Sequence, residues 1–211
     1  KKIIVETTAV DNTLVENIEE KSIVKKCADE QIQILFLARV EKYKGIYQTI
    51  DAFNTLLSKY PNISLCIAGE GNELENVKQY VRKHHSKNIA FEGYVEGEKK
   101  RHILHASHIY ILPSYSEGLP NSVLEAMACG LIIISTKVGG IVDFFVQRKN
   151  GILVDDIRPA TLASAIEQCI TDKDFRMNAS IANFLFAQRV FLASEVAKRL
   201  ENIYRQLISC T

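Results

Sequence analysis

Two glutamates eight positions apart lie in the stretch PSYSEGLPNSVLEAMACG, residues 113–130. Glu117 falls in a loop after an apolar run, and Glu125 falls one turn into the helix that we expect next. Carboxylates accept hydrogen bonds from hydroxyl groups, so both would suit the vicinal diols of a ribose or hexose. Two alternatives stay open: Glu117 as a solvated loop acid, and Glu125 as half of a capping box with Ser122.

Two cations come before another expected helix, in the stretch ARVEKYKG, residues 38–45. Arg39 lies at the end of a strand, and Lys44 comes just before the helix. A guanidinium and an ammonium group beside a helix N-terminus suit a diphosphate, because the backbone N–H groups add further donors. The commoner alternative for such residues is a pair of solvated surface cations.

The stretch AGEGNEL, residues 68–74, partly matches the dinucleotide fingerprint G-x-G-x-x-G. Leu74 stands where the third glycine belongs, and Glu92 only loosely supplies the acidic residue at the end of the next strand. A nicotinamide or flavin site is therefore weakly supported. Gly69 and Gly71 fit a tight strand-to-helix turn as well as they fit a nucleotide that approaches the backbone.

The residues that could bind a metal do not form a ligand set. His102 and His105 share a helix face and His108 follows, but no cysteine or carboxylate completes them at metal-ligand spacing. Asp172-Lys173-Asp174 resembles a metal-binding D-x-D motif, yet it lies between two C-terminal helices, where aspartate is a usual turn or N-cap residue. We therefore expect neither a metal nor another cofactor.

Composition excludes several classes of protein. The 211 residues are 47% hydrophobic and 24% charged, which is ordinary for one large globular domain. The net charge of +1 gives no support for nucleic-acid binding. No apolar run approaches the ~20 residues of a membrane span, and no signal peptide opens the chain. The five cysteines form no C-x-x-C pair, which favours buried thiols in a reducing compartment and a cytoplasmic protein.

Apolar strands and amphipathic helices alternate along the chain and must position these residues. The expected strands are 32–38, 63–69, 88–94, 109–112, 131–135 and 152–154. The expected helices are 45–59, 73–85, 98–105, about 121–128, 141–147 and 159–171, and the last 35 residues are expected to be helical. The opening run KKIIVETTAV resembles a strand.

Such alternation predicts an α/β fold, a Rossmann-like doubly wound parallel sheet with helices on both faces. Ligands of these sheets bind at the carboxyl ends of the strands. The loops expected at that edge are 39–45, 69–72, 93–97, 113–121 and 136–141.

In this order and spacing, the motifs resemble the C-terminal domain of retaining GT-B glycosyltransferases, the large group 1 family. The match runs from about residue 32 to 172 and centres on E-x7-E, which reads here EGLPNSVLE. It includes ARVEKYKG, where the family usually has G-R-x-x-x-x-K-G, and the runs IAGEG, FEGYV, VGG and NGILV. Ala38 and His108 depart from the family's usual glycine and aspartate, both at positions that look structural.

The resemblance implies a role for each matching position. Arg39 and Lys44 would hold the donor diphosphate and stabilise the leaving nucleotide without Mg²⁺. Glu117 would contact the sugar hydroxyls as an electrostatic and positioning residue, and Glu125 would bind the ribose diol. The further donor-binding positions that it implies are Gly69, Gly71, Tyr94, Val95, Gly118, Leu119, Pro120 and Asn121.

The resemblance also implies a domain organisation. Residues 1–211 would form a single nucleotide-sugar-binding domain, with a linker or crossover at 1–31 and C-terminal helices at 175–211, one half of a GT-B fold. The acceptor-binding N-terminal domain would be absent, so we expect this chain to bind donor without transferring sugar.

The implied partners are a UDP- or GDP-sugar and, through the other domain, a glycan or lipid-linked glycan acceptor of polysaccharide, lipopolysaccharide or capsule type. Family habit alone suggests peripheral contact with the inner face of a membrane. Two alternatives remain. A nucleotide-sugar 2-epimerase shares the architecture but lacks the E-G-L-P-N run with both glutamates, and a non-catalytic nucleotide-binding module would not need Glu117.

Overall fold

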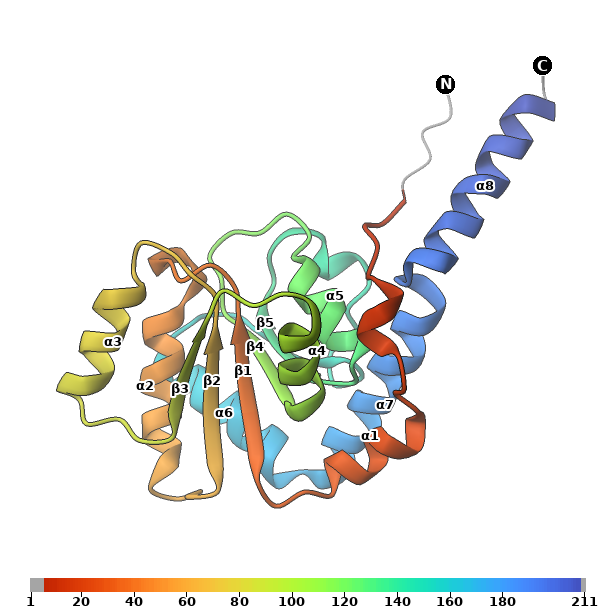
Figure 1. Ribbon diagram of the computed structural model, residues 1–211. Helices are drawn as coiled ribbons and strands as arrows, with labels where there is room; N and C mark the ends of the chain where they lie inside the picture. Colours follow the sequence, from red (N-terminus) through yellow and green to blue (C-terminus); the bar gives the residue numbers. More distant parts are fainter. Residues whose placement is uncertain (1–5, 210–211) are drawn as a thin grey trace.

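The computed structural model describes residues 6–209, in which six parallel strands form one sheet (Figure 1). The strand order is β3-β2-β1-β4-β5-β6. The strands are β1 (Ile32–Leu37), β2 (Ile63–Ala68), β3 (Ile89–Gly93), β4 (Ile109–Leu112), β5 (Ile132–Thr136) and β6 (Gly151–Val154). The chain adds strands outward from β1 to β3 on one side and from β4 to β6 on the other, so the strand order reverses between β1 and β4. The crevice outside the carboxyl ends of the strands at such a point is the usual ligand site.

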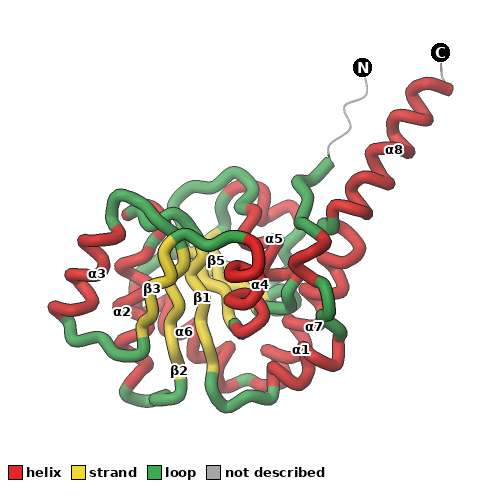
Figure 2. Tube along the Cα trace, in the orientation of Figure 1, coloured by secondary structure: helices red, strands yellow, loops and turns green. Residues whose placement is uncertain are grey.

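Helices cover both faces of this sheet. In Figures 1 and 2, α4 lies in front of the sheet, whereas α2 and α6 lie behind it. The α-helices are α1 (Glu20–Cys27), α2 (Ile46–Leu57), α3 (Leu74–Lys83), α4 (Gly97–Ala106), α5 (Asn121–Ala128), α6 (Pro159–Thr171), α7 (Lys173–Val190) and α8 (Ala193–Ser209). Three 3-10 helices join them, η1 (Asn12–Val15), η2 (Lys42–Lys44) and η3 (Gly139–Asp143). The predicted fold class is confirmed.

The central strands explain why their sequences are continuously apolar. Every residue of β4 and β5 is buried, because helices pack on both faces of the sheet. The edge strand β3 is only partly buried. The core therefore lies along β1, β4 and β5, directly beneath the carboxyl edge of the sheet.

Most predicted elements are confirmed to within two residues at each end, and two regions differ. The helix expected at 141–147 is the shorter 3-10 helix η3. In the segment expected to be a linker, α1 is an additional helix, and it packs Ile23 and Cys27 against Phe184 of α7. The strand-like opening run lies outside the described residues up to residue 5, and Val10 makes only an isolated bridge to Leu192.

The last two helices run in different directions. Helix α7 packs against α1 and α5, whereas α8 extends away from the body of the domain (Figure 1). The expected C-terminal helices are α7 and α8, with a break at residues 191–192, and residues 210–211 lie outside the described part. Between residues 6 and 209, no helix combines the length and apolar composition that crossing a bilayer requires.

Candidate functional site

A cavity of about 800 Å³ opens at the carboxyl edge of the sheet, where the strand order reverses. Its walls are residues 37–39 at the end of β1, 68–71 at the end of β2, 94–95 after β3, and side chains of α4 and α5. Of the predicted site residues, those that line it are Arg39, Gly69, Gly71, Tyr94, Val95, Asn121 and Glu125. The fold thus brings together positions that lie up to 86 residues apart in the sequence.

The glycines of the AGEG turn are required by the neighbouring backbone. Gly69 has φ of +140°, and a Cβ atom there would lie 1.9 Å from the Ala38 carbonyl oxygen. A Cβ on Gly71 would lie 2.4 Å from the Val40 carbonyl oxygen. The two loops also share a bond from the Val40 N–H to the Glu70 carbonyl, 2.9 Å long. Close packing of two strand ends therefore accounts for both glycines, and it sets the wall of the cavity.

Helix α5 decides between the two interpretations of Glu125. Its N-cap residue is Pro120, and no side chain caps it, so the capping box of Ser122 and Glu125 is wrong. The Ser122 hydroxyl lies 2.6 Å from the hydroxyl of buried Tyr110, which donates to the Leu37 carbonyl. Ser122 is the second residue of the helix and not its cap, and its hydroxyl bonds to Tyr110. The Glu125 carboxylate instead faces the cavity.

Glu125 bonds to a lysine that the sequence analysis did not single out. Lys100 of α4 donates from Nζ to Glu125 Oε1 over 2.8 Å, and both side chains line the cavity. Glu70 and Ser122 are further lining residues that were missed. Glu70 could have been found, because it lies in a loop expected at this edge. Lys100 gave no comparable signal, because it lies inside a helix.

Glu117 and Lys44 form a second ion pair, beyond the lining of the cavity. Lys44 Nζ lies 2.6 Å from Glu117 Oε1, and the side chains are only 11% and 7% exposed. The alternatives of a solvated loop acid and a solvated Lys44 are therefore wrong. Arg39 is exposed and donates to the Tyr43 hydroxyl over 2.6 Å. Of the three predicted catalytic residues, Arg39 thus lines the cavity, whereas Lys44 and Glu117 form the adjoining ion pair.

The loop that carries Glu117 is held from two sides. The Tyr43 carbonyl accepts from the Tyr115 N–H over 2.8 Å and from the Ser114 hydroxyl over 3.2 Å, which joins the loops after β1 and β4. On the other side, the Gly140 N–H donates to the Gly118 carbonyl over 2.6 Å. Gly118, Leu119 and Pro120, which were predicted to bind donor, lie in this loop and do not line the cavity.

His105, His108 and Asp172 make structural contacts. His105 Nε2 lies 2.7 Å from the Leu14 carbonyl oxygen. His108 accepts from the Gln33 N–H, and burial lowers its pKa to about 4. Asp172 caps α7 by accepting from the Phe175 N–H, which confirms the N-cap interpretation. Among the described residues, no group of histidine, cysteine or acidic side chains could hold a metal ion.

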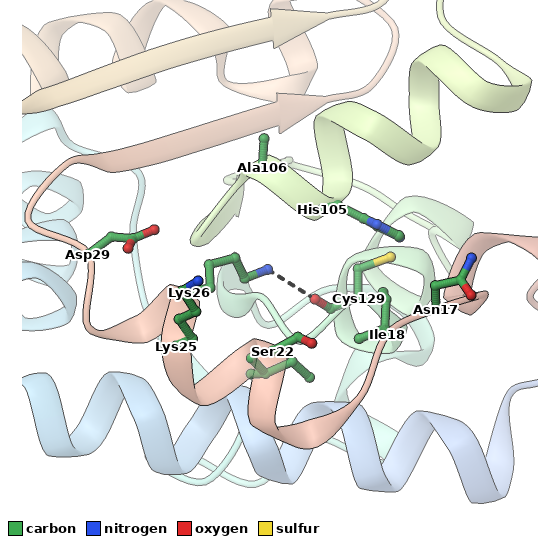
Figure 3. A pocket seen from close by; sticks show the side chains of 10 residues that line it. Asn17, Ile18, Ser22, Lys25, Lys26, Asp29, His105, Ala106 and Cys129 are labelled. Atoms are coloured by element: carbon green, nitrogen blue, oxygen red, sulfur yellow. Dashed lines mark hydrogen bonds between the residues drawn. The ribbon is translucent and has the colours of Figure 1, made fainter.

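A second cavity, of about 440 Å³, lies between α1 and the C-terminal ends of α4 and α5 (Figure 3). Lys26 points across it and donates to the Cys129 carbonyl over 3.1 Å. Burial lowers the pKa of Lys26. Because Cys129 is the C-cap of α5, the lysine satisfies a carbonyl at the helix end. This contact is sufficient to explain why a lysine is buried at position 26.

Comparison with known proteins agrees with this geometry. A family model described as glycosyl transferases group 1 matches residues 17–184. An uncharacterized glycosyltransferase of Methanocaldococcus jannaschii is 29% identical over 197 residues, which are 92% of this chain and 50% of that protein. The chain spans half or less of the length of the first curated relatives that it matches.

Two solved structures share the fold. Anabaena HepE in complex with UDP-glucose aligns with a TM-score of 0.77 and 18% identity, over 94% of this chain and 56% of HepE. The C-terminal domain of the group 1 glycosyltransferase LpcC from Francisella tularensis aligns with a TM-score of 0.71 and 25% identity, over 85% of this chain and 97% of that domain. With the family model covering most of its length, the chain belongs to the group 1 glycosyltransferases.

Proposed function

We propose that this chain is the donor-binding half of a glycosyltransferase that moves a sugar from a nucleoside-diphosphate sugar to an acceptor with retention of configuration. The observation that carries the proposal is the cavity at the carboxyl edge, because it presents a cation, a carboxylate and an uncapped helix N-terminus to one ligand. The UDP-glucose held by HepE, which shares this fold, supports a UDP-sugar, and a GDP-sugar is the alternative donor.

The nucleoside would occupy the side of the cavity formed by α4 and by the loop after β3. Tyr94 is 64% exposed there and Val95 is buried, so an aromatic surface and an apolar wall are available to a base. Glu125 would accept hydrogen bonds from the two ribose hydroxyls. A carboxylate has acceptor capacity for both hydroxyls in addition to its bond from Lys100.

The diphosphate would lie between Arg39 and the first turn of α5. No side chain caps α5, so its first backbone N–H groups can donate to an anion. As the anomeric C–O bond breaks, negative charge grows on the departing diphosphate. Arg39, Lys44 and the helix N-terminus would stabilise that charge, so the proposal includes no metal ion.

Glu117 would contact the donor sugar beside the diphosphate. Its carboxylate is paired with Lys44. A phosphate that attracts Lys44 would leave the Glu117 oxygens able to accept from sugar hydroxyls, which links donor binding to the release of this carboxylate. The backbone of Gly118 and Leu119 lies in the same loop and would adjoin the sugar.

The acceptor belongs to the part of the protein that this chain does not span. We propose a glycan or lipid-linked glycan of polysaccharide, lipopolysaccharide or capsule type, in a cytoplasmic enzyme that associates peripherally with the membrane. These elements of the proposal stand on the family resemblance. Transfer activity must be assayed in the complete protein, and that assay separates an enzyme from a non-catalytic nucleotide-binding module.

Thermal unfolding of this chain with UDP-, GDP- and ADP-sugars tests donor binding. A ligand that binds only the folded state stabilises it by about 2.7 kcal/mol at 100 times its dissociation constant. The largest shift in the midpoint identifies the donor, and we expect Lys44→Ala and Glu125→Ala to reduce it. Absence of any shift with millimolar nucleoside diphosphates would overturn the proposal.

A further inference from the structure

We infer that Lys100 is a positioning residue for Glu125, and that its ammonium group holds the carboxylate in place to receive the ribose hydroxyls of the donor. This inference rests on the proposed function, because it assigns the ribose to Glu125. It adds a residue outside the matched motifs, contributed by a helix on the opposite wall of the cavity.

The contact between the two residues is direct and partly shielded from solvent. Lys100 Nζ lies 2.8 Å from Glu125 Oε1, and the side chains are 24% and 17% exposed. Both line the cavity, so the bond lies in its wall and not on the outer surface. An ammonium–carboxylate bond of this length is charge-assisted, and it is stronger than a bond between neutral groups.

Without this bond, the Glu125 carboxylate could turn toward the N-terminus of its own helix. The first turn of α5 carries unsatisfied backbone N–H groups, and no side chain caps them. Glu125 is the fifth residue of α5, beyond the N3 position of a capping box, but its side chain leaves the helix toward the N-terminal end, whose partial positive charge attracts a carboxylate. Lys100 draws the carboxylate toward α4 and into the cavity. The lysine therefore favours the conformation that can bind a ligand.

The bond also leaves acceptor capacity on the carboxylate. Only Oε1 has a described hydrogen-bond donor, Lys100, and a carboxylate has about four lone-pair sites in all. Two vicinal hydroxyls can therefore be received while Lys100 stays bound. Pre-organising the carboxylate reduces the conformational entropy that binding would otherwise cost.

The alternative is that Lys100 binds the diphosphate itself. Ribose and diphosphate contacts are separable with analogues that lack the ribose hydroxyls. A lysine that binds the diphosphate would contribute equally to the binding of UDP and of 2′,3′-dideoxy-UDP, and its substitution would weaken the binding of both equally. Substitution of a residue that positions Glu125 would weaken the binding of UDP alone.

Isothermal titration of the 211-residue chain with UDP and 2′,3′-dideoxy-UDP provides the test, with GDP and its dideoxy analogue used if GDP binds better. Wild type should prefer the ribonucleotide about tenfold or more, the expected value of hydrogen bonds to a charged group. In Lys100→Met this preference should fall at least about threefold through weaker UDP binding, and Lys100→Arg should restore most of it.

Lys99→Met is the matched control, because Lys99 is on the same helix but pairs with Glu92 and does not line the cavity. It should leave the preference unchanged, and thermal unfolding of every variant checks its folding. Equal weakening of both ligands by Lys100→Met, or an unchanged preference, would overturn the positioning role while the proposed function stands. Failure of wild type to bind any nucleoside diphosphate would overturn both.

Discussion

Two lysines at the carboxyl edge of the sheet and a buried arginine on α7 differ in what they bond to. At the edge, Lys44 bonds to Glu117 and Lys100 to Glu125, so both partners are side chains. On α7, Arg176 donates to the carbonyls of residues 27, 169 and 170. A side-chain partner can rotate away when a ligand arrives, whereas the carbonyl of a packed backbone cannot. Similar residue types are thus free to exchange partners in one region and hold the backbone together in the other.

The largest effect that this comparison predicts is on Arg176. Its side chain is 1% exposed, so Arg176→Met would leave three carbonyls without their donor in the interior. We expect the free energy of unfolding to fall by about 4 kcal/mol in urea titration. Arg189→Met, at an exposed position of the same helix, should cost less than about 0.5 kcal/mol. A loss of UDP affinity in the folded fraction of Arg176→Met would break the distinction between the two regions.

The next effect concerns pH and the buried start of β4. The pKa of His108 falls from its ordinary 6.5 to about 4 in the folded protein, chiefly because burial disfavours the charged ring. As the pH drops below 6.5, the unfolded chain binds a proton that the folded chain binds only near pH 4. Stability should therefore decline across that window, by about 3 kcal/mol in total.

Urea unfolding at intervals from pH 7 to pH 4 measures this loss. His108→Asn should flatten the curve relative to wild type, because the asparagine does not titrate and its carbonyl can still accept from the Gln33 N–H. A wild-type slope in His108→Asn would show that other groups cause the loss.

The more buried of the two ion pairs at the edge should show a smaller effect. Glu117→Gln leaves the Lys44 ammonium largely buried without its counter-charge, and we expect a cost of about 2 kcal/mol. In a double-mutant cycle with Lys44→Met, the double variant should cost less than the sum of the two single variants. Simple additivity would show that the pair is not coupled, and would place it with ordinary surface charges.

The smallest effect on stability, with the sharpest effect on binding, should come from Glu125. The Lys100–Glu125 pair is more exposed, so Glu125→Gln should change the free energy of unfolding by less than about 1 kcal/mol. Affinity for UDP should nevertheless fall about tenfold or more, as measured by titration calorimetry. A stability loss as large as that of Glu117→Gln, with unchanged affinity, would make Glu125 a structural residue.

The strands could be predicted because their signal is local. β4 and β5 are buried on both faces, so unbroken apolar runs identify them and place the loops that follow at one edge. α1 escaped prediction because it is short and buries only Ile23 and Cys27 against the rest of the chain. Two buried positions in eight residues give a weak periodic signal.

The site could be predicted as a set of residues but not as a set of contacts. Motif spacing identified Glu117 and Lys44 separately, yet their pairing joins residues 73 positions apart and depends on which strands are neighbours. Lys100 was missed for a similar reason, because its role depends on where α4 crosses the sheet. The capping box was a plausible local pattern, but the helix begins two residues earlier than that pattern requires, and the Ser122 hydroxyl bonds to Tyr110 instead.

The Tyr43 carbonyl, which accepts from both Tyr115 and Ser114, has a consequence for protein engineering. Loop exchange between homologous enzymes usually treats each loop as an independent cassette. Here the segments 38–45 and 113–120 share that carbonyl and the Lys44–Glu117 pair, so each is fitted to the other. They form one unit of exchange, and a chimera designed to alter this edge of the sheet must transplant both together.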